Sequence, residues 1–197
     1  MKAVPFQTLP VDDGAARYWP AAFSVAEADA LFSRLRAGIP WREEEIVVFG
    51  ERKRVPRLVA WHGDPGAAYV YSGVLHEVRA RVEALSGHAF NAVLLNLYRN
   101  GADGMGWHAD DEPELGRNPV VASVSLGAAR RFRMRHRRRR DLTLQFELAH
   151  GSLLVMEGAT QHHWVHAVPK TARVVGARIN LTFRRIVAPG GRAGASA

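Results

Sequence analysis

The second half of the chain is a succession of short segments in which polar and apolar residues alternate. In the segment 178–184, Ile179, Leu181 and Phe183 alternate with arginine, asparagine and threonine. A period of two is typical of a β-strand with one apolar and one polar face. From Asn91 onward, strand follows strand at short spacing without intervening helices, which predicts a sandwich or a closed antiparallel barrel.

The first ninety residues are expected to add flanking helices to this mainly β chain (α+β). Residues 1–20 contain three prolines and are expected to be irregular. Ser24 and Glu27 form a capping box, which is a start signal for a helix. The expected elements are a helix from there to Gly38, a hairpin with strands at about 45–49 and 54–60, and a helix from about Ser72 to Ser86 that stops at Gly87.

The composition fits one compact intracellular domain. With 197 residues, of which 47% are hydrophobic, the chain can fill one core. No apolar run approaches the roughly 18 residues of a membrane span, and the N-terminus lacks the apolar segment of a signal peptide. The chain has no cysteine, so disulfides are excluded and His, Asp and Glu are the available metal ligands. We expect a single domain over residues 1–187, a disordered tail over 188–197, a monomer, and a cytoplasmic, bacterial-type location.

Positive charge is concentrated in one part of the sequence. The formal net charge is +8, which suits a polyanionic partner. Eight arginines lie within the eleven residues from Arg130 to Arg140, between two strand-like segments, so the run is expected at the end of a hairpin. A solvated charge run is the usual interpretation, and the excess of arginine over lysine is also compatible with a GC-rich genome. The density of the run favours contacts with phosphates.

Two histidines and one aspartate are spaced as a metal site. His108 and Asp110 lie two residues apart, so on a strand both side chains would point to the same face. Such a pair is common by chance and gains meaning from a third ligand. His162, His163 and His166 compete for that role; His166 is preferred, with His162 on the same face as second choice. Two imidazoles and one carboxylate form the facial triad that holds Fe(II) with open positions, although zinc in a hydrolase is an alternative.

Two further groups of polar residues lie on strand-like segments. The first is a row of two guanidiniums, an amide and a hydroxyl: Arg178, Asn180, Thr182 and Arg184. A solvated strand face is the ordinary explanation, but this combination is suited to bidentate binding of carboxylates. In the apolar segment 93–99, Asn96 and Tyr98 need hydrogen-bond partners if they are buried. A ligand or the neighbouring backbone could supply them.

These residues belong to an ordered series of motifs that resembles the AlkB family over roughly residues 45–187. The motifs are Asn96-Leu97-Tyr98, Gly106 to Glu112, Ser123 to Gly127, His150 to Met156 and Arg178 to Arg184. Four shorter segments further resemble the subgroup that repairs duplex DNA, typified by the human AlkB homolog 2. They are Val48-Phe49-Gly50, Val55-Pro56-Arg57, Gly63-Asp64 and Tyr71-Ser72-Gly73.

The resemblance implies a dioxygenase that uses Fe(II), 2-oxoglutarate and O₂ to repair alkylated bases in DNA, such as 1-methyladenine and 3-methylcytosine. The N-alkyl group would be hydroxylated and released as formaldehyde, while 2-oxoglutarate is converted to succinate and CO₂. The implied fold is a double-stranded β-helix (jelly roll) over residues 91–187. Helices and hairpins over about 1–90 would form a nucleotide-recognition lid. RNA as the substrate, and binding of alkylated nucleic acid without catalysis, are the alternatives.

The resemblance also implies roles for individual residues. His108, Asp110 and His166 would be the catalytic iron ligands, and Arg178 would pair with the distal carboxylate of 2-oxoglutarate. The remaining cosubstrate residues would be Asn96, Tyr98, Asn180, Thr182 and Arg184. The base would be contacted by Phe49, Arg57, His62, Tyr71, Ser72, Asp111 and Glu112, and phosphates by Arg137, Arg138, Arg139, Arg140, Lys170 and Arg173. Phe49 has two interpretations, a wedge that fills the gap left by a flipped nucleotide or an ordinary core residue.

Overall fold

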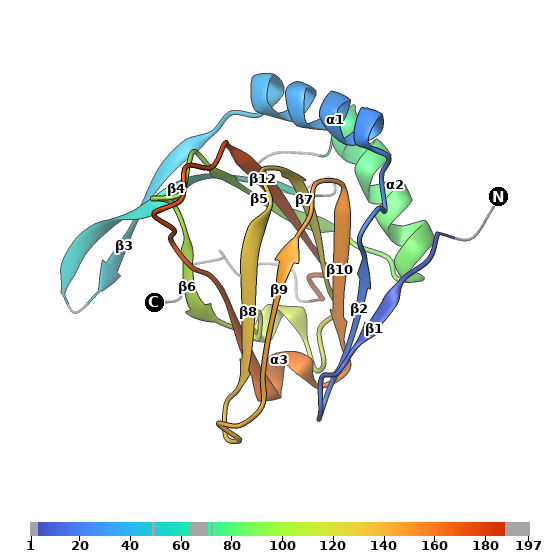
Figure 1. The fold of residues 1–197 in the computed structure, drawn as a ribbon, viewed down its shortest axis with the longest axis vertical. Coiled ribbons are helices and arrows are strands. Elements are labelled where there is room, and N and C mark those ends of the chain that lie inside the picture. The colour runs from blue at the N-terminus through green and yellow to red at the C-terminus, as the bar shows by residue number, and fades with distance from the viewer. Residues whose placement is uncertain (1–3, 49, 64–70, 72, 188–197) are drawn as a thin grey trace.

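The computed structural model describes residues 4–48, 50–63, 71 and 73–187. It consists mainly of antiparallel strands in two sheets that face one another (Figure 1). Two helices flank the larger sheet. This arrangement agrees with the mainly β fold expected from the alternating pattern.

The larger sheet has eight strands in the order β1-β2-β10-β7-β12-β5-β4-β3. Their bounds are Gln7–Leu9 (β1), Ala15–Trp19 (β2), Ser152–Glu157 (β10), Val121–Gly127 (β7), Arg178–Arg184 (β12), Ala92–Tyr98 (β5), Glu51–Gly63 (β4) and Arg42–Val48 (β3). Neighbouring strands pair antiparallel throughout. β12, which carries the polar row, lies in the middle of the sheet, and all seven of its residues are buried. A solvated strand face is therefore excluded for this row.

The smaller sheet has four strands in the order β6-β11-β8-β9. Their bounds are Met105–His108 (β6), Trp164–Val168 (β11), Arg130–His136 (β8) and Thr143–Leu148 (β9). A 3₁₀ turn (η1, Pro113–Leu115) follows β6, and a single helical turn (α3, Thr160–His163) precedes β11. β8 and β9 form the hairpin that was expected for the arginine run. Four of its eight arginines lie on β8 itself and the other four at the tip.

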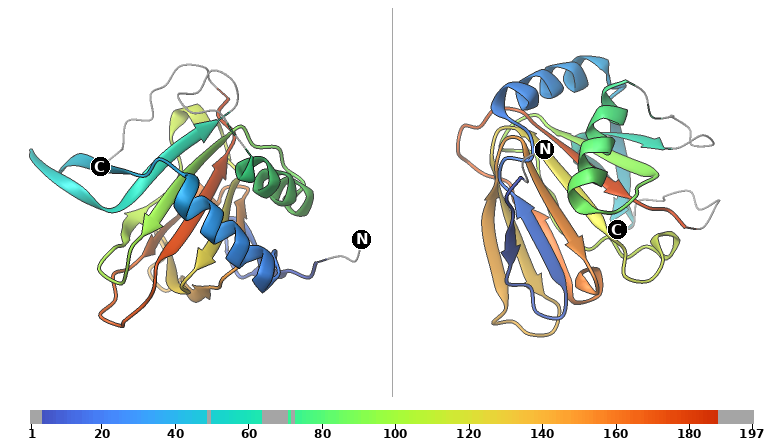
Figure 2. Two further views of the ribbon diagram at one scale, coloured as in Figure 1. Left: turned by 90° about the horizontal axis from the view of Figure 1, so that it is seen from above. Right: turned by 90° about the vertical axis from the view of Figure 1, so that its right-hand side faces the viewer.

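Helices α1 (Val25–Gly38) and α2 (Val74–Ser86) cover the outer face of the larger sheet (Figure 2). α1 begins with the expected capping box, in which the Ser24 hydroxyl accepts from the Glu27 N–H and the Glu27 carboxylate accepts from the Ser24 N–H. α2 ends where Gly87 adopts φ = 78°, a left-handed conformation that glycine reaches without strain. No described helix is long and apolar enough to cross a bilayer.

Alternate residues of the larger sheet serve two different layers. Ile179, Leu181 and Phe183 of β12 pack with the apolar faces of α1 and α2. The intervening polar residues of β12 point toward the smaller sheet, where they share a cavity with Phe132 and His166. The space between the sheets is otherwise filled by a second apolar cluster that includes Tyr18, Met134, Leu154, Met156 and Trp164.

The expectation of an irregular N-terminus was wrong. Residues 7–9 and 15–19 form β1 and β2, and β2 pairs with β10, whose residues lie more than 130 positions further along the chain. The prolines mark the ends of these strands rather than an absence of structure, since Pro10 follows β1 and Pro20 follows β2. Both faces of β2 are covered, with Trp19 in the helix-side cluster and Tyr18 between the sheets.

The hairpin of the N-terminal half is longer than its pattern indicated. β3 and β4 cover Arg42–Val48 and Glu51–Gly63, whereas the alternation predicted 45–49 and 54–60. The extra residues are stabilised by pairing, because β4 also binds along β5 from Leu58 to Gly63. The hairpin projects from the body of the molecule beside β6 (Figure 1).

Candidate active site

The two sheets bring His108, Asp110 and His166 together between them. β6 and β11 pair so that His166 lies opposite His108, and their ring centroids are 4.2 Å apart. Asp110 follows β6 by two residues, and its carboxylate Oδ2 lies 3.6 Å from Nε2 of His166. One ligand atom from each residue lies within 4.8 Å of the other two. This is the spacing of a group that could hold one metal ion.

Neighbouring groups orient these side chains and favour the forms that can bind a metal. Nδ1 of His108 lies 3.0 Å from the Gly106 carbonyl; because a carbonyl only accepts, Nδ1 carries the proton and the lone pair is on Nε2. Burial and the nearby His108 lower the pKa of His166 to about 3, so its ring is neutral and can act as a ligand. The N–H of Asp110 donates to the buried amide of Gln161 at 3.0 Å, which fixes the backbone at this position.

Arg184 holds the carboxylate of the triad. Its Nε donates to Asp110 Oδ1 at 3.1 Å, and its Nη2 donates to the same oxygen. Burial by itself would raise the pKa of Asp110, but Arg184 and the two histidines hold that pKa well below its usual value. Arg184 was expected among the cosubstrate residues, and it lies in their cavity. Its described bonds, however, go to the metal triad.

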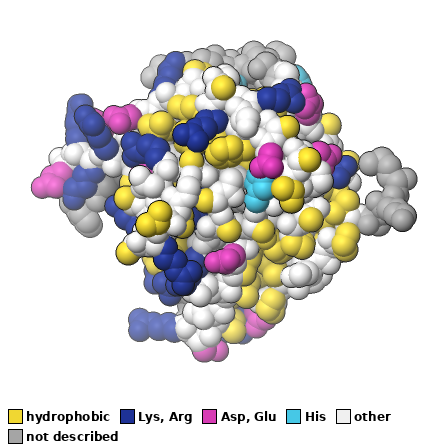
Figure 3. Space-filling view, turned by 45° about the horizontal axis from the view of Figure 1, so that its top comes forward, with side chains coloured by type: hydrophobic (Ala, Val, Ile, Leu, Met, Phe, Trp, Pro, Cys, Tyr) yellow, Lys and Arg dark blue, Asp and Glu magenta, His cyan; other side chains and the backbone are white. Residues whose placement is uncertain are grey.

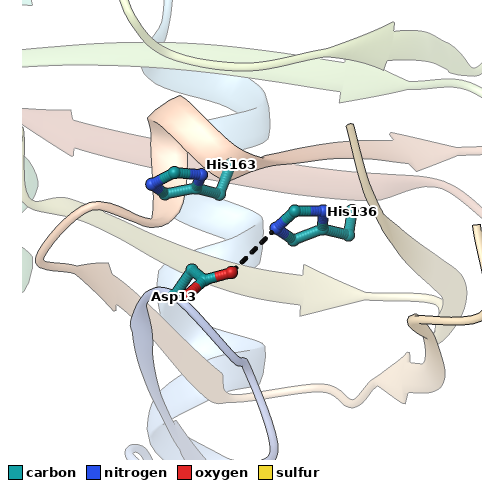
Figure 4. A group of neighbouring side chains, drawn as sticks. All are labelled: Asp13, His136 and His163. Carbon is teal, nitrogen blue, oxygen red and sulfur yellow. Dashed lines mark ion pairs between the residues drawn. The ribbon is translucent and has the colours of Figure 1, made fainter. Parts of the chain in front are cut away.

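The other two histidines are directed elsewhere. His162 and His163 lie in α3 rather than on a strand, so neither shares the inward face of His166. His163 stacks on His136 with a centroid separation of 5.7 Å, and His136 Nε2 lies 3.2 Å from Asp13 (Figure 4). Nδ1 of His136 accepts the backbone N–H groups of residues 138 and 139, which leaves the proton on Nε2 facing Asp13. A metal would need the lone pair at that nitrogen, so this second cluster is better described as a link between the arginine hairpin and the β1–β2 turn.

The polar row of β12 lines the same cavity as the triad. Arg178 is 1% exposed and its guanidinium lies 5.0 Å from the centre of the Tyr98 ring. Nη2 of Arg178 donates to Ser125 at 2.9 Å. Asn180 donates to Ser123 and accepts from Thr182, so these two residues act as a hydrogen-bonded support. Ser123 and Ser125 were not predicted as site residues, although their alternation with Val124 on β7 could have indicated a shared polar face.

The cavity suits a dicarboxylate beside a metal ion. Nε and Nη1 of Arg178 and Nη1 of Arg184 are buried without a hydrogen-bond partner in the described protein. Burying guanidinium N–H groups without acceptors is unfavourable, and burial lowers the pKa of Arg178. A ligand with carboxylate oxygens would satisfy both arginines. We conclude that 2-oxoglutarate and Fe(II) fit the residues present.

A second cavity leads from the metal triad to the surface. Arg57 and Trp61 of β4 line it together with His108, Asp110 and Glu112. Arg57 also donates to Asn96 at 2.6 Å. This bond links the second cavity, called the entrance cavity below, to the cosubstrate cavity that Asn96 lines. Trp61 was not proposed from the sequence, although it shares the face of Arg57 at a spacing of four residues on a strand. Burial raises the pKa of Glu112, whose Oε2 is also buried without a described partner.

Several residues assigned to the base lie elsewhere. His62 is adjacent to Trp61 on β4 and therefore points to the opposite face, away from the cavity. Tyr71 is buried in the helix-side cluster near His76. Asp111 is paired with Arg137 at 2.6 Å instead of entering the cavity. The last two assignments, Phe49 and Ser72, lie outside the described residues.

The arginines of the hairpin fall into three groups. Arg130 is buried and donates to the backbone carbonyls of residues 100, 103 and 169, so it holds the structure together. Arg137 pairs with Asp111, and Arg139 pairs with Asp12 and Asp13. Arg131, Arg133, Arg135, Arg138 and Arg140 have no ion pair among the described residues. Lys170 and Arg173 line a separate cavity with Arg131, about 20 Å from the tip along β8.

Comparison with known proteins agrees with this geometry. Residues 15–184 match the family described as the 2OG-Fe(II) oxygenase superfamily. The structure of OsALKBH1 superposes with a TM-score of 0.63 at 16% identity, covering 92% of this chain and all of that one. An oxidoreductase of the 2OG-Fe(II) oxygenase family from Burkholderia pseudomallei gives 0.60 at 16% identity, covering 89% and 86%. Fold, triad and family match place the chain in the class of 2OG-Fe(II) oxygenases.

Closer relatives define the branch within this class. The chain is 40% identical to human alpha-ketoglutarate-dependent dioxygenase alkB homolog 3 over 187 residues, which is 85% of this chain and 65% of that protein. It is 41% identical to mouse DNA oxidative demethylase ALKBH2 over 185 residues, covering 84% and 77%. The chain belongs to the AlkB family. It spans somewhat less than two thirds of the length of the human, bovine and rat alkB homolog 3 proteins.

Proposed function

We propose that this protein is an oxidative demethylase of alkylated nucleic-acid bases that depends on Fe(II), 2-oxoglutarate and O₂. One observation carries the proposal: the His108–Asp110–His166 triad shares a cavity with Arg178 and Arg184, two buried arginines that each keep at least one guanidinium nitrogen without a hydrogen-bond partner among the described residues. When bound, Fe(II) with its cosubstrates supplies the oxidation of a C–H bond in the alkyl group. Hydroxylation of an N-methyl carbon gives a hemiaminal, which breaks its C–N bond, releases formaldehyde and restores the base.

The chain's own residues bind and orient the reactants. Arg178 attracts the distal carboxylate of the cosubstrate in a site from which water is largely excluded, so the charge interaction is strong. The Ser125 hydroxyl oxygen accepts a hydrogen bond from Nη2 of Arg178 and keeps the guanidinium in place. His108 is held through Nδ1 and so would present Nε2 to the metal, and His166 would present a neutral ring. Asp110 would offer one carboxylate oxygen while Arg184 bonds to the other.

The outer cavity is suited to a base that has left its stack. A base inside a duplex is out of reach of a buried metal, so it must be flipped out or already single-stranded. Trp61 supplies a ring at the entrance, and Arg57 and Glu112 supply polar groups beside it. Acidic groups at the entrance would favour a cationic lesion such as 1-methyladenine or 3-methylcytosine. Relatives named DNA oxidative demethylase support DNA as the substrate, and RNA is the alternative.

Purification without oxygen, followed by addition of Fe(II), tests this proposal. Methylated DNA and RNA oligonucleotides of the same sequence are incubated with 2-oxoglutarate and air, and the masses of the products are measured by mass spectrometry. We expect loss of 14 Da per lesion (roughly one CH₂ group), with equimolar succinate and formaldehyde. Succinate formation without base repair would indicate another substrate class, and absence of both would contradict an oxygenase.

A further inference from the structure

The outer face of the smaller sheet carries a groove of about 700 Å³ that the proposed chemistry does not use. Trp107 of β6 and Arg133 and Arg135 of β8 contribute to its floor. The Arg135 guanidinium lies 4.3 Å from the centre of the Trp107 ring, and that of Arg133 lies 5.6 Å away. Trp107 remains 37% exposed, which makes it one of the few large apolar side chains on the described surface.

The charge of this groove is unbalanced. Its described lining contains four arginines and no acidic residue, and of the four only Arg137 has an ion pair among the described residues, with Asp111. Across β8 and β9, Arg133 lies opposite Gln145, and Arg135 lies opposite Thr143. On the other side, β11 presents Val165 and Ala167. Basic side chains also gather on the side of the molecule from which the β3–β4 hairpin projects (Figure 3).

The groove is connected to the candidate active site through one strand. Trp107 and His108 are neighbours on β6, so one faces outward into the groove while the other faces the metal site. β6 is an edge strand of the smaller sheet, and its residues also line the entrance cavity. Among the described residues, β6 therefore carries side chains of both the entrance cavity and the groove, so a flexible chain that crosses this strand can reach Trp107.

From this arrangement we propose that the groove binds the single-stranded stretch next to the target nucleotide. Trp107 stacks on a base, and Arg133 and Arg135 hold the adjacent phosphates. Aromatic rings with flanking cations are the chemistry that binds single strands without sequence preference, because every base has a π-face. Side chains two apart on a strand are separated by about 7 Å, which is on the scale of neighbouring phosphates in an extended strand. Duplex bases remain stacked on each other and could not use Trp107.

This inference rests on the proposed function for its substrate, but its test does not require turnover. Binding of a fluorescein-labelled, unmodified 15-nucleotide DNA strand to the metal-free protein is followed by anisotropy. We expect Trp107→Ala to weaken binding about five- to a hundredfold, and Trp107→Phe to restore most of it. Arg133→Gln with Arg135→Gln should flatten the dependence of log affinity on log salt by about 1.4, or roughly 0.7 per lost phosphate contact.

A charge-matched control comes from α1. Arg34→Gln with Arg36→Gln removes two positive charges on the far side of the larger sheet and should leave affinity and salt slope unchanged. Melting temperatures show whether each variant is folded. If Trp107→Ala does not fold, the salt slope of the Arg133→Gln, Arg135→Gln variant tests the groove instead. Unchanged binding in folded groove variants would overturn the inference, as would equal losses with a blunt duplex of the same length. Formaldehyde release by the unaltered protein from a methylated trinucleotide tests the proposed function separately.

Discussion

Arg184 and Asp110, 74 residues apart in the sequence, form a buried ion pair in which two guanidinium nitrogens bond to the same carboxylate oxygen, Oδ1. The other oxygen, Oδ2, faces His166. The pair therefore decides which oxygen is available to a metal. It also connects the polar row of β12 to the metal triad, so a change in one of these two groups is expected to disturb the other.

Because of this ion pair, His166→Ala and Asp110→Ala should differ in their effect on the stability of the protein. His166→Ala should abolish iron binding and turnover while the melting temperature changes little, because a neutral ring is removed. Asp110→Ala should abolish turnover as well, but it leaves Arg184 buried without its partner and should lower the free energy of unfolding by about 3–5 kcal/mol. Iron content measures metal binding, succinate formation measures turnover, and urea unfolding measures the free energy of unfolding. His162→Ala serves as the control, and more than a few per cent of normal turnover in His166→Ala would contradict the triad.

Arg178→Met should raise the requirement for 2-oxoglutarate. A charge-assisted hydrogen bond contributes about 1.5–3 kcal/mol, which corresponds to a ten- to a hundredfold loss of affinity. Methionine keeps the packing against Tyr98 without the charge. The 2-oxoglutarate concentration that gives half-maximal succinate formation checks this. If it is unchanged, Arg178 does not bind the cosubstrate.

The tip of the arginine hairpin should contribute to duplex binding through its unpaired members. Arg138→Gln with Arg140→Gln should flatten the salt dependence of duplex affinity by roughly 0.9 log units per contact, similarly for all sequences. Arg137→Gln and Arg139→Gln should have smaller effects, because these side chains already pair with Asp111, Asp12 and Asp13. Filter binding at several salt concentrations measures the slopes. Equal slopes in every variant would identify the tip as a solvated turn.

Stability should depend on pH through Asp103. Its carboxylate accepts from the backbone N, Nε and Nη2 of Arg99 at 2.8–2.9 Å, and these bonds outweigh burial and lower the pKa of Asp103. A carboxyl group with a lowered folded pKa stabilises the protein above its unfolded pKa of about 4, and this contribution is lost as the pH falls further. Asp103→Asn should therefore lower the free energy of unfolding by about 1–3 kcal/mol at pH 7 and by much less at pH 3. A difference independent of pH in urea titrations would argue against this.

Phe49 lies outside the described residues, so its prediction depends on the sequence alone. If it acts as a wedge, Phe49→Ala should reduce repair of duplex DNA much more than repair of single strands, where no gap needs to be filled. Parallel assays on the two substrates measure the ratio. Equal losses together with a lower melting temperature would make Phe49 a core residue.

The sequence by itself determined features that depend on near neighbours. Alternation predicted β12 and other strands of the second half, the capping box predicted α1, and the two-residue spacing singled out His108 and Asp110, although Asp110 lies two residues beyond the end of β6. These signals are local, because the periods of strands and helices are fixed by backbone geometry. The ordered motifs added the family and, through it, the cosubstrate.

Only the tertiary structure decided which faces and partners these elements meet. Alternation could not say whether the polar row of β12 faced water or the smaller sheet, and it could not distinguish His62 from Trp61 as the residue at the entrance. The strands at residues 7–19 were missed because their stability comes from pairing with β10, far along the chain. The arginine run looked uniform in sequence, yet burial separates Arg130 from its neighbours, and Asp111 and Asp12 neutralise two others. Such pairings depend on contacts between segments that are distant in the sequence, and local periodicity carries no information about those contacts.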